Sequence, residues 1–138
     1  MASLNITSFA KHIDELRVFL NDQNIDILAI NETRLNERIS DRVVKVQGYD
    51  TIRRDRSTNG RFGGGVCFYI RSNILMLKLL VETILSSTDL DSQLLEIIST
   101  VITSWYKPPN SPHEYFSHIS TLLGKLDSEN VEYFFMGD

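Results

Sequence analysis

The chain of 138 residues is poor in cysteine and proline and has no long uninterrupted apolar stretch. Its single cysteine, Cys67, cannot form an internal disulfide, and its place in an apolar run predicts a buried, inert thiol in a reducing compartment. The most apolar window, 74–81, contains Lys78 and is too short to span a bilayer, and residues 1–5 show no secretory signal pattern. We therefore expect an intracellular protein, nuclear or cytoplasmic, that does not contact membranes.

Two kinds of chemistry are disfavoured by what the sequence lacks. The net charge of −4 argues against a protein that binds nucleic acid over its whole surface, although a local basic patch is compatible with it. No pair of histidines or cysteines has the spacing of a zinc site. Because 42% of the residues are hydrophobic and 23% are charged, the composition is that of an ordinary globular chain, and the length suits a single domain, 1–138.

The most informative stretch is the short apolar run 27–30, which is rich in β-branched residues and is followed at once by Asn31 and Glu32. An unbroken run of this kind predicts a strand that is buried on both faces. In open α/β sheets, ligands and catalytic groups gather just beyond the carboxyl ends of the strands. Glu32 is therefore the first candidate for a functional carboxylate, although acidic residues at strand ends are also common without a function.

A similar unit occurs at both ends of the chain. Near the start, a strand around Leu4 and an amphipathic helix over 9–21 precede the run 27–30, which predicts a parallel crossover. Near the end, a helix that begins with a capping box at 111–114 precedes an apolar strand, 131–136, and then Asp138. Each unit would bring one carboxylate to a strand end, which suggests oxygen ligands for a hard cation such as Mg²⁺.

The middle of the chain is less regular. Strands are predicted at 50–54, 66–70, 94–98 and 101–105, and the stretch 74–85 is compatible with either helix or strand. The glycine triplet before Val66 lacks the lysine and the following helix of a phosphate-binding loop, so a tight turn into a core strand is the favoured interpretation. The arginines from Arg53 to Arg61 are interpreted as a solvated loop, with a phosphate-contacting patch as the less favoured alternative. Only Ser99 and Thr100 separate the last two strands, which is unusual for a two-residue hairpin without Gly or Asn.

Several short motifs, taken in their order, resemble those of the endonuclease/exonuclease/phosphatase superfamily. The motifs are Leu4-Asn5-Ile6, Ile30-Asn31-Glu32-Thr33-Arg34, Gly64-Gly65-Val66, Trp105-Tyr106-Lys107-Pro108-Pro109-Asn110 and Gly137-Asp138. Within that superfamily, the chain is most similar to the endonuclease domain of non-LTR retrotransposon polyproteins, which also carry a reverse transcriptase. The similarity runs along essentially the whole chain, and its specificity lies in the order and spacing of the motifs.

This resemblance implies an α/β fold that forms the amino-terminal part of a four-layer α/β/β/α sandwich, together with Mg²⁺- or Mn²⁺-dependent cleavage of phosphodiester bonds in DNA. By resemblance, Glu32 and Asn5 bind the metal, Tyr106 contacts the scissile phosphate, and Asp138 positions or activates the attacking water. The transfer of a phosphate-contacting role to Arg34 is weaker.

The chain departs from the family pattern in two respects. It stops before the asparagine that follows Asp138 in the motif and before the later aspartate and histidine, and the hairpin near Ser99 is shorter than usual. We therefore expect a single incomplete domain that is inactive alone, and that self-associates because its inner sheet face has lost its cover. Two alternatives are a non-catalytic α/β module that binds a phosphate-bearing or protein partner, and a signalling-type doubly wound domain in which Glu32 and Asp138 are incidental.

Overall fold

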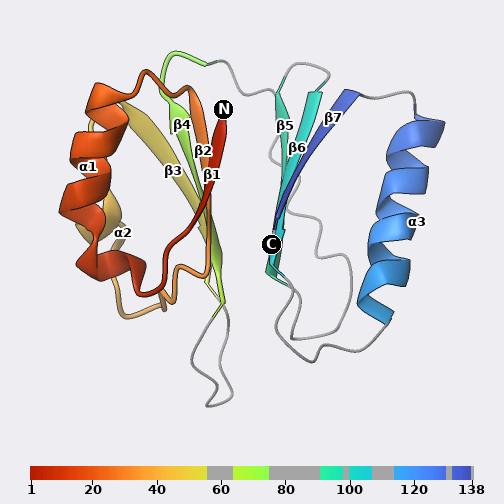
Figure 1. The fold of residues 1–138 in the computed structure, drawn as a ribbon, viewed down its shortest axis with the longest axis horizontal. Coiled ribbons are helices and arrows are strands. Elements are labelled where there is room, and N and C mark those ends of the chain that lie inside the picture. The colour runs from red at the N-terminus through yellow and green to blue at the C-terminus, as the bar shows by residue number, and fades with distance from the viewer. Residues whose placement is uncertain (56–63, 75–90, 98–99, 107–113, 130–131, 138) are drawn as a thin grey trace.

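The computed structural model describes residues 1–55, 64–74, 91–97, 100–106, 114–129 and 132–137. Two sheets lie face to face, with helices on the outer face of each, so that the chain forms four layers in the order helix, sheet, sheet, helix (Figure 1). Among the described residues, no helix combines the length and the apolar character needed to cross a membrane.

The first sheet has four strands in the order β1-β2-β4-β3. Their bounds are Ala2–Asn5 for β1, Ile27–Asn31 for β2, Tyr49–Arg54 for β3 and Val66–Arg71 for β4. Strands β1 and β2 are parallel, as the predicted crossover requires, and β4 runs antiparallel to both β2 and β3. All five residues of β2 are buried, which confirms the prediction of a strand covered on both faces.

The outer face of this sheet packs against the connection between β1 and β2. The amphipathic stretch expected over 9–21 divides into a 3-10 helix, η1 (Phe9–Lys11), and an α-helix, α1 (Ile13–Asp22). A short helix, α2 (Asp41–Val44), lies beside α1 and begins at Ser40, whose side chain accepts a hydrogen bond from the backbone N–H of Arg42 at 3.3 Å. The core formed here is made by Phe9, Ile13, Leu16, Leu20, Leu28, Ile30, Val44 and Tyr69, among others.

Two tyrosine hydroxyls tie the connecting segments to the sheet. Tyr69 on β4 donates a hydrogen bond to the carbonyl of Val44, and Tyr49 on β3 donates one to the carbonyl of Ile25 at 2.6 Å. These bonds satisfy buried carbonyls that would otherwise be costly to bury. Cys67 is fully buried in the same core and burial raises the pKa of its thiol, so the prediction of a buried, inert cysteine is confirmed.

The second sheet has three strands in the order β5-β6-β7, with bounds Asp91–Ile97, Thr100–Tyr106 and Glu132–Gly137. Strands β5 and β6 are antiparallel and pair from Asp91↔Tyr106 to Ile97↔Thr100, so the two strands predicted on either side of Ser99 and Thr100 are neighbours, and Thr100 belongs to β6. Strand β7 is parallel to β6, and helix α3 (Glu114–Ser128) packs on the outer face.

The inner faces of the two sheets meet in a second core. Ile27 and Ala29 of β2, Phe68 and Ile70 of β4, and Ile102 of β6 are all buried and pack together. The expectation that the inner face of the first sheet has lost its cover is therefore wrong. Strands β5 and β6, close to the strands predicted at 94–98 and 101–105, lie against β2 and β4, and Ile102 supplies the described part of that cover.

Several predictions fall outside the described residues. One is the assignment of 75–85 to helix or strand, and another is the capping box, of which only Glu114 is described. The positions of Arg56, Arg61 and Asp138 also lie outside the described residues.

Candidate functional site

The candidate site lies at the carboxyl ends of β1 and β2. The register between these parallel strands places Asn5 opposite Asn31, so Glu32 is the first residue beyond the paired region. Asn31 is buried, and Asn5 is exposed on the edge strand of the sheet. Asn5 and Glu32 therefore lie at the rim where α/β folds usually place their ligands.

The backbone at this rim is strained. Glu32 and Arg34 adopt left-handed conformations, with φ of 58° and 51°, and so does Ser8 in the loop after β1, with φ of 62°. These are all of the non-glycine residues with positive φ in the part of the chain that the structure describes. Such conformations cost about 1–3 kcal/mol each and cluster at functional sites, where the surrounding structure holds them in place.

Hydrogen bonds from two neighbouring segments hold the strained loop. The carbonyl of Thr33 accepts from the backbone N–H of Phe9 at 3.1 Å, which ties the loop to the segment after β1. On its other side, the N–H of Thr33 donates to Gly65 O at 3.2 Å and the N–H of Arg34 donates to Gly64 O at 2.8 Å. Gly64 and Gly65 both have positive φ and lead directly into β4, so these two glycines form the turn that the sequence favoured over a phosphate-binding loop.

The carboxylate of Glu32 is mostly buried and is only loosely held. Its side chain is 16% exposed, and its Oε2 atom is 3.5 Å from the hydroxyl of Thr7 and 3.7 Å from Nη2 of Arg34. Charge-assisted hydrogen bonds normally measure about 2.7–2.9 Å, so both contacts are long. A carboxylate that is shielded from water but weakly satisfied is suited to attracting a cation.

A cavity of about 360 Å³ lies beside the same rim. It runs along the edge strand β1 and the facing side of α1, where Nδ1 of His12, the residue before α1, lies 3.0 Å from Oε2 of Glu15. Its lining residues are Leu4, Asn5, Ile6, Thr7, His12, Glu15, Leu16 and Phe19. Asn5 and Thr7 therefore line this cavity and also belong to the rim around Glu32.

The two parallel strands of the second sheet, β6 and β7, have their carboxyl ends on the same side of the molecule as this rim. Strand β6 ends at Tyr106, and the parallel strand β7 ends at Gly137, which pairs with Trp105. In Figure 1 the carboxyl ends of β1, β2, β6 and β7 all point toward the lower edge of the view. Asp138 lies outside the described residues, so the predicted convergence of Asn5, Glu32, Tyr106 and Asp138 remains a prediction.

The donor atoms at this rim fit a hard cation. Mg²⁺ is typically bound by one or two protein oxygens together with waters and substrate phosphates, and Glu32 and Asn5 supply a carboxylate and an amide oxygen. Within the described residues there is no group of three or more His, Cys, Asp or Glu side chains placed to hold a metal ion by itself.

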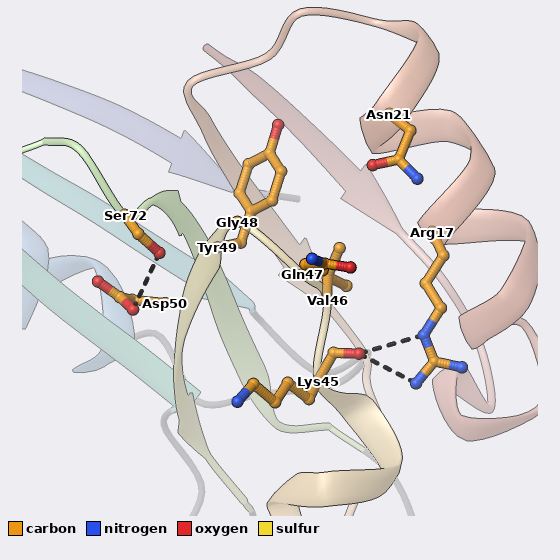
Figure 2. Close-up of a pocket in the computed structure, with 9 residues that line it drawn as sticks. All are labelled: Arg17, Asn21, Lys45, Val46, Gln47, Gly48, Tyr49, Asp50 and Ser72. Carbon is orange, nitrogen blue, oxygen red and sulfur yellow. Dashed lines mark hydrogen bonds between the residues drawn. The ribbon is translucent and has the colours of Figure 1, made fainter.

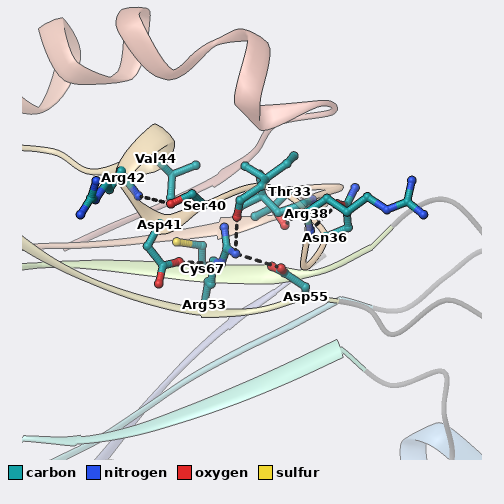
Figure 3. A network of polar contacts seen from close by, with 12 residues as sticks. Thr33, Asn36, Arg38, Ser40, Asp41, Arg42, Val44, Arg53, Asp55 and Cys67 are labelled. Carbon is teal, nitrogen blue, oxygen red and sulfur yellow. Dashed lines mark hydrogen bonds and ion pairs between the residues drawn. The ribbon is translucent and has the colours of Figure 1, made fainter.

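The sequence analysis missed a cluster of charged residues formed by Arg53, Asp41 and Asp55, because it interpreted the arginine-rich segment as a solvated loop. Arg53 lies within β3, its side chain is only 15% exposed, and its Nε is 3.0 Å from Oδ1 of Asp41 (Figure 3). Its Nη2 donates to the carbonyl of Ile39 at 2.6 Å and lies 3.4 Å from Oδ2 of Asp55. Arg53 thus fastens the segment after Arg34 to the sheet. The sequence signal was its place in the strand predicted at 50–54, and in the structure it pairs with the buried Cys67.

Burial in this cluster raises the pKa of Asp55, and the nearby Arg53 only partly opposes that effect. One oxygen of Asp55, Oδ1, and one nitrogen of Arg53, Nη1, are buried and have no hydrogen-bond partner among the residues that the structure describes. The cluster is therefore incompletely satisfied. It lies at the same end of the sheet as Glu32, because Asn31 and Arg54, the last residues of β2 and β3, both pair with Val66 of β4.

A larger cavity, of about 780 Å³, lies at the opposite end of the first sheet (Figure 2). Its wall includes the start of β3, the turn after β4 and the α1 side chain of Arg17, which donates to the carbonyl of Lys45 through Nε at 3.1 Å and Nη2 at 3.0 Å. Arg17 also pairs with Asp14 at 2.6 Å. Because these groups are bound to one another far from Glu32, this cavity does not belong to the candidate site.

No protein-family model matches the chain, and neither does any curated protein. Solved structures do match. They include the 3′–5′ exonuclease NExo from Neisseria meningitidis (14% identity, TM-score 0.71), the AP endonuclease LMAP from Leishmania major (17%, 0.69) and the endonuclease domain of TRAS1, a telomere-specific non-LTR retrotransposon (14%, 0.62). Each match covers 99% of this chain but only 53–56% of the other.

These structures are nucleases of the endonuclease/exonuclease/phosphatase superfamily, and the fold of residues 1–138 matches the amino-terminal part of their α/β sandwich. The predicted fold class and the resemblance are therefore confirmed at the level of the fold. The chain spans about half the length of the solved structures that it matches.

Proposed function

We propose that residues 1–138 are a single incomplete domain, the amino-terminal part of a divalent-metal-dependent phosphodiesterase of the retrotransposon endonuclease type. The observation that carries the proposal is the strained, loosely held carboxylate of Glu32 at the shared carboxyl end of β1 and β2. A nuclease fold supports the same conclusion, because its structural neighbours include endonucleases and an exonuclease. The proposed partner is DNA, which the 3′ phosphatase form of NExo is described as binding.

In this proposal, the residues of the chain have separate roles. Glu32 and Asn5 hold Mg²⁺ or Mn²⁺, which when bound supplies positive charge against the developing negative charge on the phosphate. Tyr106 contacts the phosphate, Arg34 contributes a second positive group there, and Asp138 orients the attacking water. The strained loop keeps Glu32 in place without the cation, so little reorganisation is needed when the cation binds.

The test of this proposal is a titration of residues 1–138 with Mn²⁺. Binding is detected by NMR as the paramagnetic broadening of backbone amide signals. Glu32→Gln should weaken binding at least tenfold, because removing even a group that supports a metal ligand typically costs about 10–100-fold. The matched control is Glu37→Gln, which makes the same change of charge on an exposed residue five positions further along. Equal effects of the two substitutions, or broadening centred away from Asn5 and Glu32, would contradict the proposed metal site.

We also propose that the chain self-associates, although not through the face first expected. The inner face of the first sheet is covered, but Phe134 and Phe135 on β7 are 43% and 39% exposed. Because successive side chains of a strand point to opposite faces, each face of β7, the last strand in the order β5-β6-β7, exposes one aromatic side chain, and exposed apolar groups on such an edge strand favour association. Size-exclusion chromatography with light scattering should show a mass that rises with concentration, and Phe134→Ser should reduce that rise. A constant monomer mass up to high concentration would contradict this expectation.

A further inference from the structure

The starting observation is that, among the residues that the structure describes, the same oxygen of Glu32 makes both polar contacts of that carboxylate. Oε2 is approached by the neutral hydroxyl of Thr7 at 3.5 Å and by the positive guanidinium of Arg34 at 3.7 Å. The Arg34 side chain is nearly half exposed, whereas that of Glu32 is mostly buried. Arg34 is therefore the positively charged and more exposed of the two partners of this oxygen, at the position where a cation would bind.

A divalent cation and the Arg34 guanidinium compete for this position. A bound Mg²⁺ lies about 2.0–2.1 Å from its oxygen ligands, and its charge repels a second positive group a few ångströms away. The hydroxyl of Thr7 carries no charge and can stay in place. The ion pair of Arg34 is long and half-exposed, and pairs of this kind are worth little in water, so the guanidinium can leave at small cost.

The backbone favours movement of the side chain alone. The N–H of Arg34 is fixed to the carbonyl of Gly64 at 2.8 Å, and its φ of 51° is held by the same contacts. The Cα atom therefore stays at the rim while the long, flexible side chain changes direction. A guanidinium released here remains next to the cation, where it can form two parallel hydrogen bonds to a phosphate group.

We propose that Arg34 exchanges partners: it is the counter-ion of Glu32 before a divalent cation binds, and it is released to bind phosphate once the cation is present. This inference rests on the metal site proposed for Glu32. It makes phosphate binding by Arg34 depend on the cation, so that an anion is captured at the rim only when the metal site is filled.

The first experiment compares Mn²⁺ affinities of residues 1–138 and two variants with the same loss of charge. Arg34→Gln should bind Mn²⁺ about two- to fivefold more tightly, which corresponds to removing a competing exposed ion pair of up to about 1 kcal/mol. The control is Arg38→Gln, which neutralises an exposed arginine in the same segment and should leave the affinity nearly unchanged. Equal tightening in both variants, or weaker binding in Arg34→Gln, would overturn the exchange.

The second experiment needs no variant and so does not depend on the folding of one. The side-chain Nε–H signal of Arg34 is followed by NMR while Mg²⁺ and then inorganic phosphate are added. It should shift with Mg²⁺ at the concentrations that shift the amide of Glu32, and phosphate should shift it further only when Mg²⁺ is present. An Arg34 signal that ignores Mg²⁺, or that responds equally to phosphate without it, would overturn the proposal.

The two proposals fail in different ways. If Glu32→Gln leaves Mn²⁺ binding intact, the metal site itself is wrong, whatever Arg34 does. If Glu32→Gln abolishes binding while Arg34→Gln matches Arg38→Gln, the metal site stands and only the exchange is wrong.

Discussion

Residues 1–138 should cleave phosphodiester bonds in Mg²⁺ at a rate lower, by a factor on the order of 10²–10³ or more, than an intact endonuclease of the same fold. The physical reason is that transition-state stabilisation comes from several groups acting together, and losing one donor alone has an effect of that size. The solved neighbours extend well beyond the part that matches this chain, which covers only 53–56% of them. By the resemblance, further catalytic groups lie in that additional part.

The measurement is the nicking of supercoiled plasmid by purified protein, with the TRAS1 endonuclease domain assayed alongside as the intact comparison. Glu32→Gln serves as the control for contaminating nucleases, because background cleavage would persist in it. Magnesium-dependent nicking at a rate near that of the comparison, abolished by Glu32→Gln, would show that residues 1–138 suffice for catalysis and would contradict the prediction.

Phe68→Ala should lower the free energy of unfolding by about 3–5 kcal/mol, the usual range for a buried phenylalanine replaced by alanine. Phe68 is fully buried on β4, and the side chains packed with it include Ile27 and Ile70 of the first sheet and Ile102 of the second. Its burial depends on the contact between the two sheets. The substitution therefore measures whether the second sheet covers the first in solution.

The measurement is urea unfolding followed by far-ultraviolet circular dichroism. Val18→Ala is the control, because Val18 is 60% exposed on α1 and its truncation should change the stability by no more than about 0.5 kcal/mol. A loss below about 1 kcal/mol for Phe68→Ala would mean that this face of β4 is open to water. In that case, the expectation from the sequence that the inner face of the first sheet is uncovered would be correct.

The sequence was sufficient to predict the elements in which local pattern and burial agree. The run 27–30 has no polar interruption and is rich in β-branched residues, which favours a strand covered on both faces, and all of β2 is buried. The crossover to a parallel neighbour followed from the length of the amphipathic connection, and β1 pairs with β2 as expected. The glycines before Val66 also behaved as their flexibility suggests, because Gly64 and Gly65 adopt positive φ.

Other features depended on contacts between residues that are distant in the chain. The cover over the inner face of the first sheet comes from Ile102, more than 30 residues after Phe68, and no local pattern reports which sheet a strand will face. Arg53 looks like a surface residue in an arginine-rich segment, yet its side chain is only 15% exposed. Asp41 and the carbonyl of Ile39 reach it from the segment after Arg34, and Asp55 reaches it from the end of its own strand.

For the candidate site, the division is similar. The sequence by itself pointed to Glu32, because a carboxylate that directly follows a buried strand must lie at the rim of the sheet. Only the tertiary structure decided how that carboxylate is held: the left-handed backbone of Glu32 and Arg34, the hydroxyl of Thr7 and the carbonyls of Gly64 and Gly65 act together there. Backbone strain and shared contacts arise only when three separate segments are packed against one another, so they leave no signal in the local sequence.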